Sequence, residues 1–395
     1  MKLRRLLAIL LCAAMIVSAA FGCSSEDKED LSPDVTAPPD DTSGFTAGIE
    51  EVPSVVDPSF TVDYDAAFAA FEPDTAMMVV GDHTVTWAEL FFLIREELHY
   101  LIEDIGGFPN LSAMQPDGIT YAEMIKEFVQ LNAMQFRAFE QGALFLDITL
   151  SEEDLEKIDT AIRSMVSAAG SDELFAHMLW ERSCVYDPDL YYYLIRLDYL
   201  AFLIYENQFG EYGELVSDAQ LAEATKNDGY VMAKHIMREK TGDSSVVQRR
   251  DLRKILDELD GYSGDNLSYF FDDLMFQHSE DGGGLSDFPG GYLFQAGDLD
   301  DAFYEACLKL EEGQYSGILE TTYAFHILYR VPIVYDTVPI SIAMSGDTST
   351  LRMIAVADMF EALIAGWREN LVPAPVFTAE FESLDLAAVF GVPVE

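Results

Sequence analysis

The stretches Tyr230-Val-Met-Ala-Lys-His-Ile-Met237 and Thr321-Thr-Tyr-Ala-Phe-His-Ile-Leu-Tyr-Arg330 decide the fold of the central part of this chain. Each places one His-Ile step in a short apolar run that is typical of a β-strand. Between them lie two helical patterns, 247–259 and 266–276, and the Gly-rich turn Asp281-Gly-Gly-Gly284. A short helix (299–310) and a short strand (317–320) precede the second stretch. The order of elements predicts a small sheet with helices packed against it.

The segment 229–333 is similar over its whole length to the parvulin type of peptidyl-prolyl isomerase domain. In that family two histidines on strands meet behind a small proline pocket, and the resemblance places His235 and His326 in these two positions. It also implies a site role for Asp281, beside the reacting peptide bond, and for Thr321, near the second histidine. Without the resemblance, a lone histidine on an apolar strand is an ordinary core residue, and Asp281 is an ordinary turn residue.

The resemblance also implies an apolar pocket for the proline ring, formed by Phe294, Leu299 and Phe303. Leu299 stands where the family usually has Met, and Asp300 replaces a Gln that often helps to bind the peptide. Arg249 and its basic neighbours are better explained as one solvated helix face than as a phosphate site. The sequence therefore does not predict selectivity for phosphorylated Ser/Thr-Pro.

The first 22 residues are typical of an export signal, because basic residues precede an apolar run from Leu6 to Ala20. This run ends in Ala20-Phe-Gly-Cys23, which resembles a bacterial lipobox and implies that Cys23 becomes the lipidated first residue of the mature protein. Two acyl chains there would anchor the protein stably at the outer face of the cell membrane. An ordinary secretory signal or an uncleaved anchor remains an alternative.

The chain of 395 residues carries a formal net charge of −47. Loss of residues 1–22 would remove three positive charges and no negative charge, which leaves −50. Such a surface argues against binding to nucleic acid and would attract cationic unfolded proteins. A generally acidic proteome in the source organism explains the charge equally well. The sequence contains no metal-binding or cofactor-binding motif, so we expect neither.

The remaining sequence predicts an α+β protein. Residues 23–75 are rich in Pro, Ser, Thr and acidic residues and predict a disordered tether, with a short helix possible over 63–71. Residues 76–228 predict a hairpin followed by helices, which resembles the N-terminal chaperone-like domain of the PrsA and SurA foldases. The parvulin-like domain (229–333) would be inserted, and the C-terminal helix and tail (334–395) would pack back on the helical domain.

Together these features predict a membrane-anchored, extracytoplasmic foldase that isomerises X–Pro bonds in exported, unfolded proteins. The alternative is a non-catalytic chaperone or peptide-binding lipoprotein that keeps the parvulin fold as a docking module. A solute-binding lipoprotein is a weaker third interpretation, because the repeated βαβ pattern of such proteins is missing.

Overall fold

The structure is a computed structural model, and it describes residues 55–56, 60–116, 118–240 and 245–392. The expected export signal, Cys23 and most of the expected tether lie outside these residues. Among the described residues, no helix has both the length and the apolar character needed to cross a membrane.

The chain divides into two compact units. Unit 1 comprises the described residues up to Ile204 and from Glu361 onward, and unit 2 spans Tyr205–Phe360. Helices and small antiparallel sheets together confirm the predicted α+β class. Two helices have residues in both units: α7 (Pro188–Phe209) and α14 (Leu351–Glu369).

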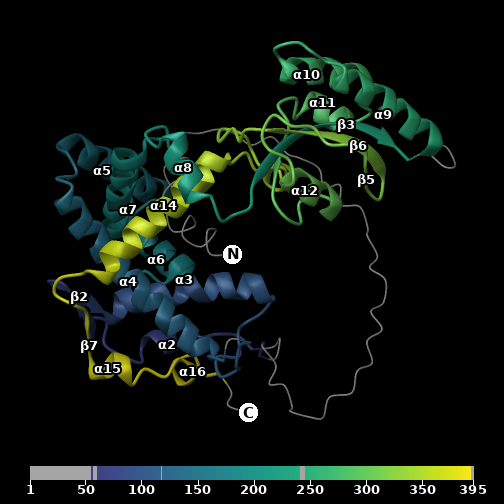
Figure 1. Cartoon of the computed structure of the whole chain (residues 1–395). Coiled ribbons are helices and arrows are strands. Elements are labelled where there is room, and N and C mark those ends of the chain that lie inside the picture. Colours follow the sequence, from purple (N-terminus) through teal and green to yellow (C-terminus); the bar gives the residue numbers. More distant parts are fainter. Residues whose placement is uncertain (1–54, 57–59, 117, 241–244, 393–395) are drawn as a thin grey trace, which may run out of the picture. The chain divides into compact units, whose positions relative to one another are not determined.

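Unit 1 is mainly helical (Figure 1). Its other elements are α2 (Tyr64–Phe68), β1 (Ala76–Val80), β2 (His83–Thr86), α3 (Trp87–Ile105), α4 (Tyr121–Phe145), α5 (Glu152–Ala169), α6 (Asp172–Ser183), β7 (Val376–Phe377), α15 (Ala379–Glu382) and α16 (Leu386–Val389). The predicted hairpin forms, with a turn through Gly81 at φ +67° between β1 and β2. A complete capping box starts α4, where Thr120 and Glu123 each accept from the other's backbone N–H.

Residues 60–75 belong to the folded unit, whereas the sequence analysis assigned them to the tether. The ring of Phe68 in α2 lies 5.2 Å from that of Phe91 and 5.0 Å from that of Trp180. Trp87 donates a hydrogen bond of 2.6 Å from its indole N–H to the Phe68 carbonyl. The apolar spacing in this segment is too short to stand out from the surrounding polar sequence, so its packing was not visible in the pattern.

The C-terminal tail completes unit 1. Strand β7 pairs with β1, with Met78 opposite Phe377, and gives the sheet order β2-β1-β7. Lys126 of α4 donates to the Leu384 carbonyl at 3.1 Å. The tail showed no clear sequence pattern because its elements have only two to four residues each.

Unit 2 is built on a four-stranded antiparallel sheet with the order β4-β3-β6-β5. Helices α9 and α10 lie on one side of this sheet and α12 on the other (Figure 1). Its elements are α8 (Asp218–Ala224), β3 (Val231–Glu239), α9 (Ser245–Asp260), α10 (Leu267–His278), α11 (Gly282–Ser286), β4 (Tyr292–Phe294), α12 (Asp301–Leu308), β5 (Leu319–Glu320), β6 (Ala324–Val331) and α13 (Ile340–Met344).

Unit 2 differs from the predicted domain in three respects. It is longer than 229–333, since α8, α13 and the first part of α14 belong to it. The predicted Gly-rich loop is a short helix, α11, because the Asp281 side chain caps its first turn. Strand β4 was not predicted, since three residues after a Pro-Gly-Gly turn carry too little alternation to be recognised.

The core of unit 2 is continuous with the face of the sheet that carries the two histidines. Its buried residues are Val231, Ala233, Phe294, Phe303, Cys307, Leu328 and Ile340.

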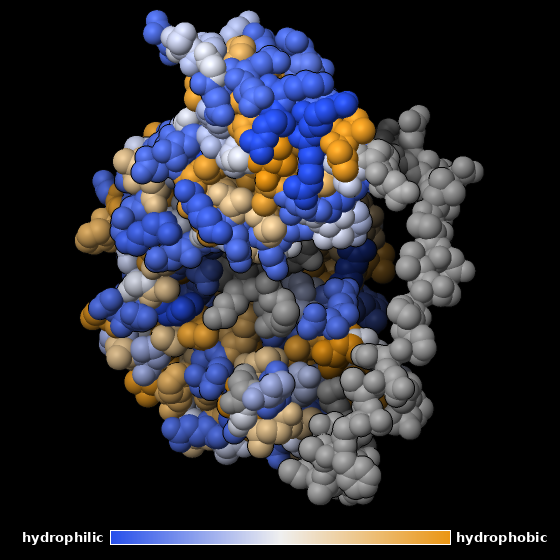
Figure 2. Space-filling view, turned by 45° about the vertical axis from the view of Figure 1, so that its right-hand side comes forward, coloured by the Kyte–Doolittle hydropathy of each residue, from blue (hydrophilic) through white to orange (hydrophobic). Residues whose placement is uncertain are grey.

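At the surface, Figure 2 shows a face on which hydrophilic residues are frequent and apolar residues gather in a few places. Cys184 and Cys307 are free and buried.

Candidate functional site

The register of β3 and β6 brings the two histidines together. His235 lies opposite Leu328, and Met237 lies opposite His326. The histidines are therefore diagonal neighbours on one face of the sheet, since side chains two residues apart on a strand share a face. Their rings are nearly parallel, with centroids 5.2 Å apart and Nδ1 atoms 3.1 Å apart. Both side chains are buried.

Asp281 and Thr321 extend this pair at its two ends. His235 Nε2 lies 2.5 Å from Asp281 Oδ2, and His326 Nε2 lies 3.0 Å from Thr321 Oγ1. The structure thus brings together all four residues that the resemblance placed at the site. They form one hydrogen-bonded chain that crosses the sheet from the start of α11 to the β5–β6 turn.

The proton positions in this chain follow from the charge of Asp281. An ionised carboxylate only accepts, so His235 donates to it from Nε2, and a neutral His235 then has its acceptor at Nδ1. His326 must then donate from Nδ1 to His235, and its Nε2 accepts from the Thr321 hydroxyl. Each imidazole carries one proton in this arrangement, and each contact has one donor and one acceptor.

The electrostatics favour an ionised Asp281 and a neutral His326. Burial alone would raise the pKa of Asp281, but hydrogen bonds from His235, the Gly284 N–H and Tyr292 lower it well below its usual range. Burial of the ring, followed by the neighbouring His235, lowers the pKa of His326 from 6.5 to about 3. His326 is therefore neutral at physiological pH.

The three predicted pocket residues take different positions. Phe303 of α12 sets its ring edge-on against both histidines, at centroid distances of 5.4 Å to His235 and 5.3 Å to His326. Leu299 is half-buried beside the same core. Phe294 is 0% exposed and packs behind Phe303 at 5.5 Å, so it supports the pocket wall and offers no surface to a ligand in this structure.

Two further residues shape the site: Tyr292, which was not recognised from the sequence, and Asp300, which was noted only as the replacement of a peptide-binding Gln. Tyr292 donates from its hydroxyl to Asp281 Oδ2 at 2.7 Å, and burial followed by this bond raises its pKa above the usual range. Asp300 accepts from the Thr322 backbone N–H and hydroxyl, both at 3.1 Å, which ties the turn next to Thr321 to the start of α12. Both contacts join segments that are distant in sequence, so no local sequence pattern predicts them.

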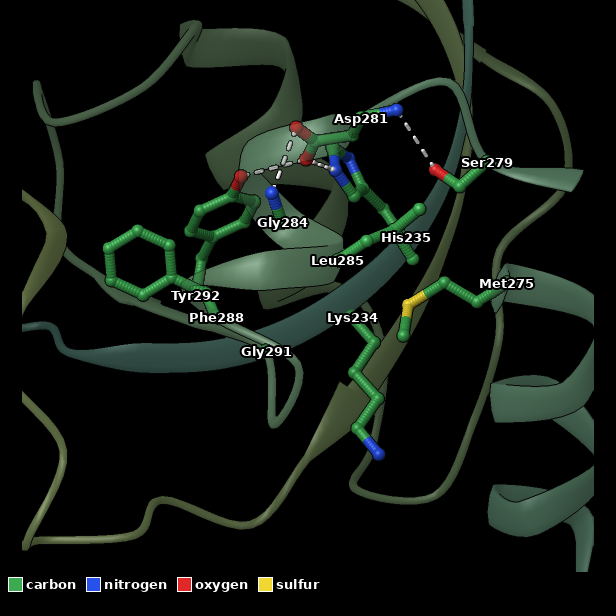
Figure 3. Close-up of a pocket in the computed structure, with 10 residues that line it drawn as sticks. All are labelled: Lys234, His235, Met275, Ser279, Asp281, Gly284, Leu285, Phe288, Gly291 and Tyr292. Atoms are coloured by element: carbon green, nitrogen blue, oxygen red, sulfur yellow. Dashed lines mark hydrogen bonds and ion pairs between the residues drawn. The ribbon is translucent and has the colours of Figure 1, made fainter. Parts of the chain in front are cut away.

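A small cavity with room for about one water molecule, partly open to solvent, adjoins Asp281 (Figure 3). The Asp281 carboxylate and the Tyr292 hydroxyl meet at one end of it, and Phe288 lies beside Tyr292 (Figure 3). None of the predicted pocket residues Phe294, Leu299 and Phe303 lines this cavity, whose other walls come from Lys234, His235, Met275, Ser279, Gly284, Leu285 and Gly291. Within the described ranges, no group of three or more His, Cys, Asp or Glu side chains is placed to hold a metal ion.

No protein-family model matches this chain, and no curated protein matches it either. Solved structures do resemble it. A peptidylprolyl isomerase, PrsA, from Bacillus cereus is 17% identical, with 70% of this chain and 96% of that chain covered and a TM-score of 0.29. The foldase PrsA from Lactococcus lactis is 12% identical, with 80% and 98% covered and a TM-score of 0.26.

A further similar structure is one of two SurA-like chaperones, PEB4 and Cj1289, from Campylobacter jejuni, at 16% identity. It covers 70% of this chain and 90% of its own, with a TM-score of 0.23. The structures similar to this chain are thus PrsA foldases and SurA-like chaperones. Because identities and TM-scores are this low, function has to be inferred from the geometry of the site itself.

Proposed function

We propose that this chain is an extracytoplasmic folding factor that catalyses cis/trans isomerisation of X–Pro bonds in exported, unfolded proteins. The observation that carries the proposal is the hydrogen-bonded chain from Asp281 through His235 and His326 to Thr321, bordered by Phe303. A buried polar network with every contact satisfied is rigid, and rigidity is what a site needs to favour one rotational state of a bound peptide bond.

The chemistry requires no proton transfer and no nucleophile. Rotation about the X–Pro amide passes through a twisted state in which amide resonance is lost. Resonance makes the carbonyl oxygen of the planar amide more negative than that of the twisted amide. A fixed negative charge on Asp281 beside this oxygen therefore raises the energy of the planar form relative to the twisted form.

The apolar side of the site would hold the proline ring while the carbonyl turns. Leu299 and the edge of Phe303 supply this surface, and Phe294 fixes Phe303 from behind. Tyr323, which is 81% exposed in the turn after Thr321, gives the extended client chain a further apolar contact.

The test is exchange NMR on short X–Pro peptides of varied X with the purified full chain. We expect the wild type to accelerate exchange and Asp281→Asn to reduce the rate constant by at least about tenfold, because the fixed charge is lost while the shape is kept. Asp287→Asn is the matched control, since Asp287 is an exposed acidic residue at the other end of α11. Equal rates for the wild type and Asp281→Asn would exclude the assigned site.

The proposal includes anchoring through a lipid on Cys23. Its support is the sequence of the first 23 residues alone. We expect Cys23→Ser to move the protein from the membrane fraction to the soluble fraction and to abolish the mass added by a diacylglyceryl group. A membrane-bound Cys23→Ser protein of uncleaved length would identify a signal anchor instead.

A second function, client holding without catalysis, is favoured by three observations. Phe303 is only 4% exposed, and the cavity beside Asp281 does not include the proposed proline pocket. In unit 1, Leu144, Phe145 and Val372 are each more than 70% exposed, and the Val372 carbonyl accepts from Gln141 on the same helix as the first two. Suppressed aggregation of an unfolded client, together with unchanged prolyl exchange rates, would favour this function.

A further inference from the structure

We propose that Tyr292 and Gly284 are positioning residues of the site, which hold the Asp281 carboxylate in one orientation and thereby set the proton positions from His235 to Thr321. The effect of these residues on rate rests on the proposed isomerase function. Their effect on the proton positions does not rest on that function and can be measured without an assay of isomerisation.

The two oxygens of Asp281 have separate partners. Oδ1 accepts from the Gly284 N–H at 3.0 Å and so caps α11. Oδ2 accepts from the Tyr292 hydroxyl at 2.7 Å and from His235 Nε2 at 2.5 Å. A carboxylate that only capped the helix would need no more than the bond from the Gly284 N–H. The second pair of bonds fixes its rotation and directs one lone pair at His235.

Gly284 leaves the space in which this arrangement fits. A Cβ at position 284 would lie 2.3 Å from Asp281 Oδ2, 2.9 Å from its Cγ and 3.0 Å from the Tyr292 hydroxyl. A Cβ at Gly282, two residues earlier in the same turn, would meet nothing within 4 Å. Of these two glycines, only the one that faces the carboxylate is therefore required by its surroundings.

Tyr292 is held so that its hydroxyl has little freedom. It lies on β4 opposite Ala233, two residues before His235, and its ring meets that of His235 edge-on at 5.5 Å. The ring of Phe288 packs on it at 5.0 Å. Because its pKa is raised, the hydroxyl keeps its proton and remains a donor throughout the working pH range.

The orientation of Asp281 also affects Thr321, because each contact in the hydrogen-bonded chain between them needs one donor and one acceptor. His235 Nε2 carries its proton because Oδ2 is charged and points at it. If the carboxylate turns away or becomes protonated, His235 is free to carry its proton on Nδ1. His326 then accepts from His235 at its own Nδ1 and donates from Nε2 to the Thr321 hydroxyl. The Thr321 hydroxyl can take up this change, because the Ala324 carbonyl lies 3.3 Å away as an alternative acceptor.

The experiment compares Tyr292→Phe, Gly284→Ala and the control Gly282→Ala in the full chain. The carboxyl ¹³C shift of Asp281 is followed against pH, and long-range ¹⁵N–¹H spectra identify the histidine tautomers. In the wild type and Gly282→Ala, we expect His235 as the Nε2–H tautomer and His326 as the rarer Nδ1–H tautomer at pH 7.

In Tyr292→Phe, we expect the midpoint of the Asp281 titration to rise by about one pH unit, since one hydrogen bond to a charged group is lost. The acid limb of the isomerisation rate should move by the same amount while KM stays unchanged. In Gly284→Ala, we expect the two tautomer signatures to be lost at pH 7 and kcat to fall at least about tenfold.

An unchanged Asp281 titration in Tyr292→Phe would overturn the proposal, as would wild-type tautomers in Gly284→Ala. If Gly284→Ala does not fold, the titration of Tyr292→Phe decides alone. If the wild type catalyses no isomerisation, the proposed function fails, while the titrations and tautomers still decide whether Tyr292 and Gly284 position Asp281.

Discussion

Acidification should weaken unit 2 through His326, and the size of this effect can be worked out from its burial. The ring of His326 is buried against His235 and Phe303, and its pKa falls from 6.5 in the unfolded chain to about 3 in the fold. Between these values the unfolded chain binds a proton that the folded chain does not. The free energy of unfolding therefore falls as the pH drops below 6.5.

From pH 7 to pH 4.5 the loss amounts to about 2 to 3 kcal/mol, given 1.36 kcal/mol per pH unit for one proton. This figure does not depend on the exact folded value, provided that it lies below 4.5. His326→Gln removes the titrating group and keeps a side chain that can donate and accept. Between pH 7 and pH 4.5, the decrease in the free energy of unfolding should therefore be about 2 to 3 kcal/mol smaller in the variant than in the wild type.

Urea unfolding at both pH values measures the effect, with methyl NMR signals of the buried Ile236 and Ile327 reporting on unit 2. Tryptophan fluorescence follows unit 1 in the same samples, since Trp87, Trp180 and Trp367 all belong to it. His278→Gln is the matched control, because it removes a histidine of unit 2 outside the hydrogen-bonded chain. Equal acid sensitivity of His326→Gln and the wild type would refute the reasoning.

Three other outcomes are expected. Burial raises the pKa of Asp198 in unit 1 to about 7, so the folded unit holds a proton that the unfolded chain releases above pH 3.8. Asp198→Asn should therefore stabilise unit 1 at pH 8 and leave it nearly unchanged at pH 4, as measured by tryptophan fluorescence in urea. Phe303→Ala should destabilise unit 2 by about 3 to 5 kcal/mol, because it leaves a cavity under both histidines, and urea-dependent methyl spectra that match the wild type would contradict this packing. Burial raises the pKa of Cys184 to about 12 and that of Cys307 to about 11, so both thiols should react with a thiol reagent only after unfolding, and fast labelling of either in the native chain would show that it is accessible.

The parts of unit 2 that the sequence predicted are those with a strong local signal. The two strands that carry His235 and His326 stand out because each is a largely apolar run that contains one His-Ile step. The helices α9 and α10 follow from periodic apolar residues. Within the site, the family resemblance pointed to Asp281 and Thr321, and the register of β3 and β6 explains why the two histidines meet.

The parts that were missed depend on contacts between distant segments. Tyr292 lies 11 residues after Asp281 and joins it only because β4 pairs with β3. Phe294 was assigned to the proline pocket from the family resemblance, and its apolar character alone does not reveal that it packs behind Phe303. Burial of Phe68 under Trp87 likewise depends on tertiary packing, and its own segment is too short to predict it.

The sheet of unit 1 has a consequence for the order in which the chain acquires structure. Strand β1 (76–80) finds its second partner in β7 (376–377), almost 300 residues later, so this sheet stays incomplete until nearly the whole chain has been made. Unit 2 is one continuous segment, Tyr205–Phe360. Since contacts of high sequence separation form slowly, unit 2 should reach its native state first. Unit 1 would then be completed last, and truncation near the C-terminus should damage unit 1 while sparing the histidine site.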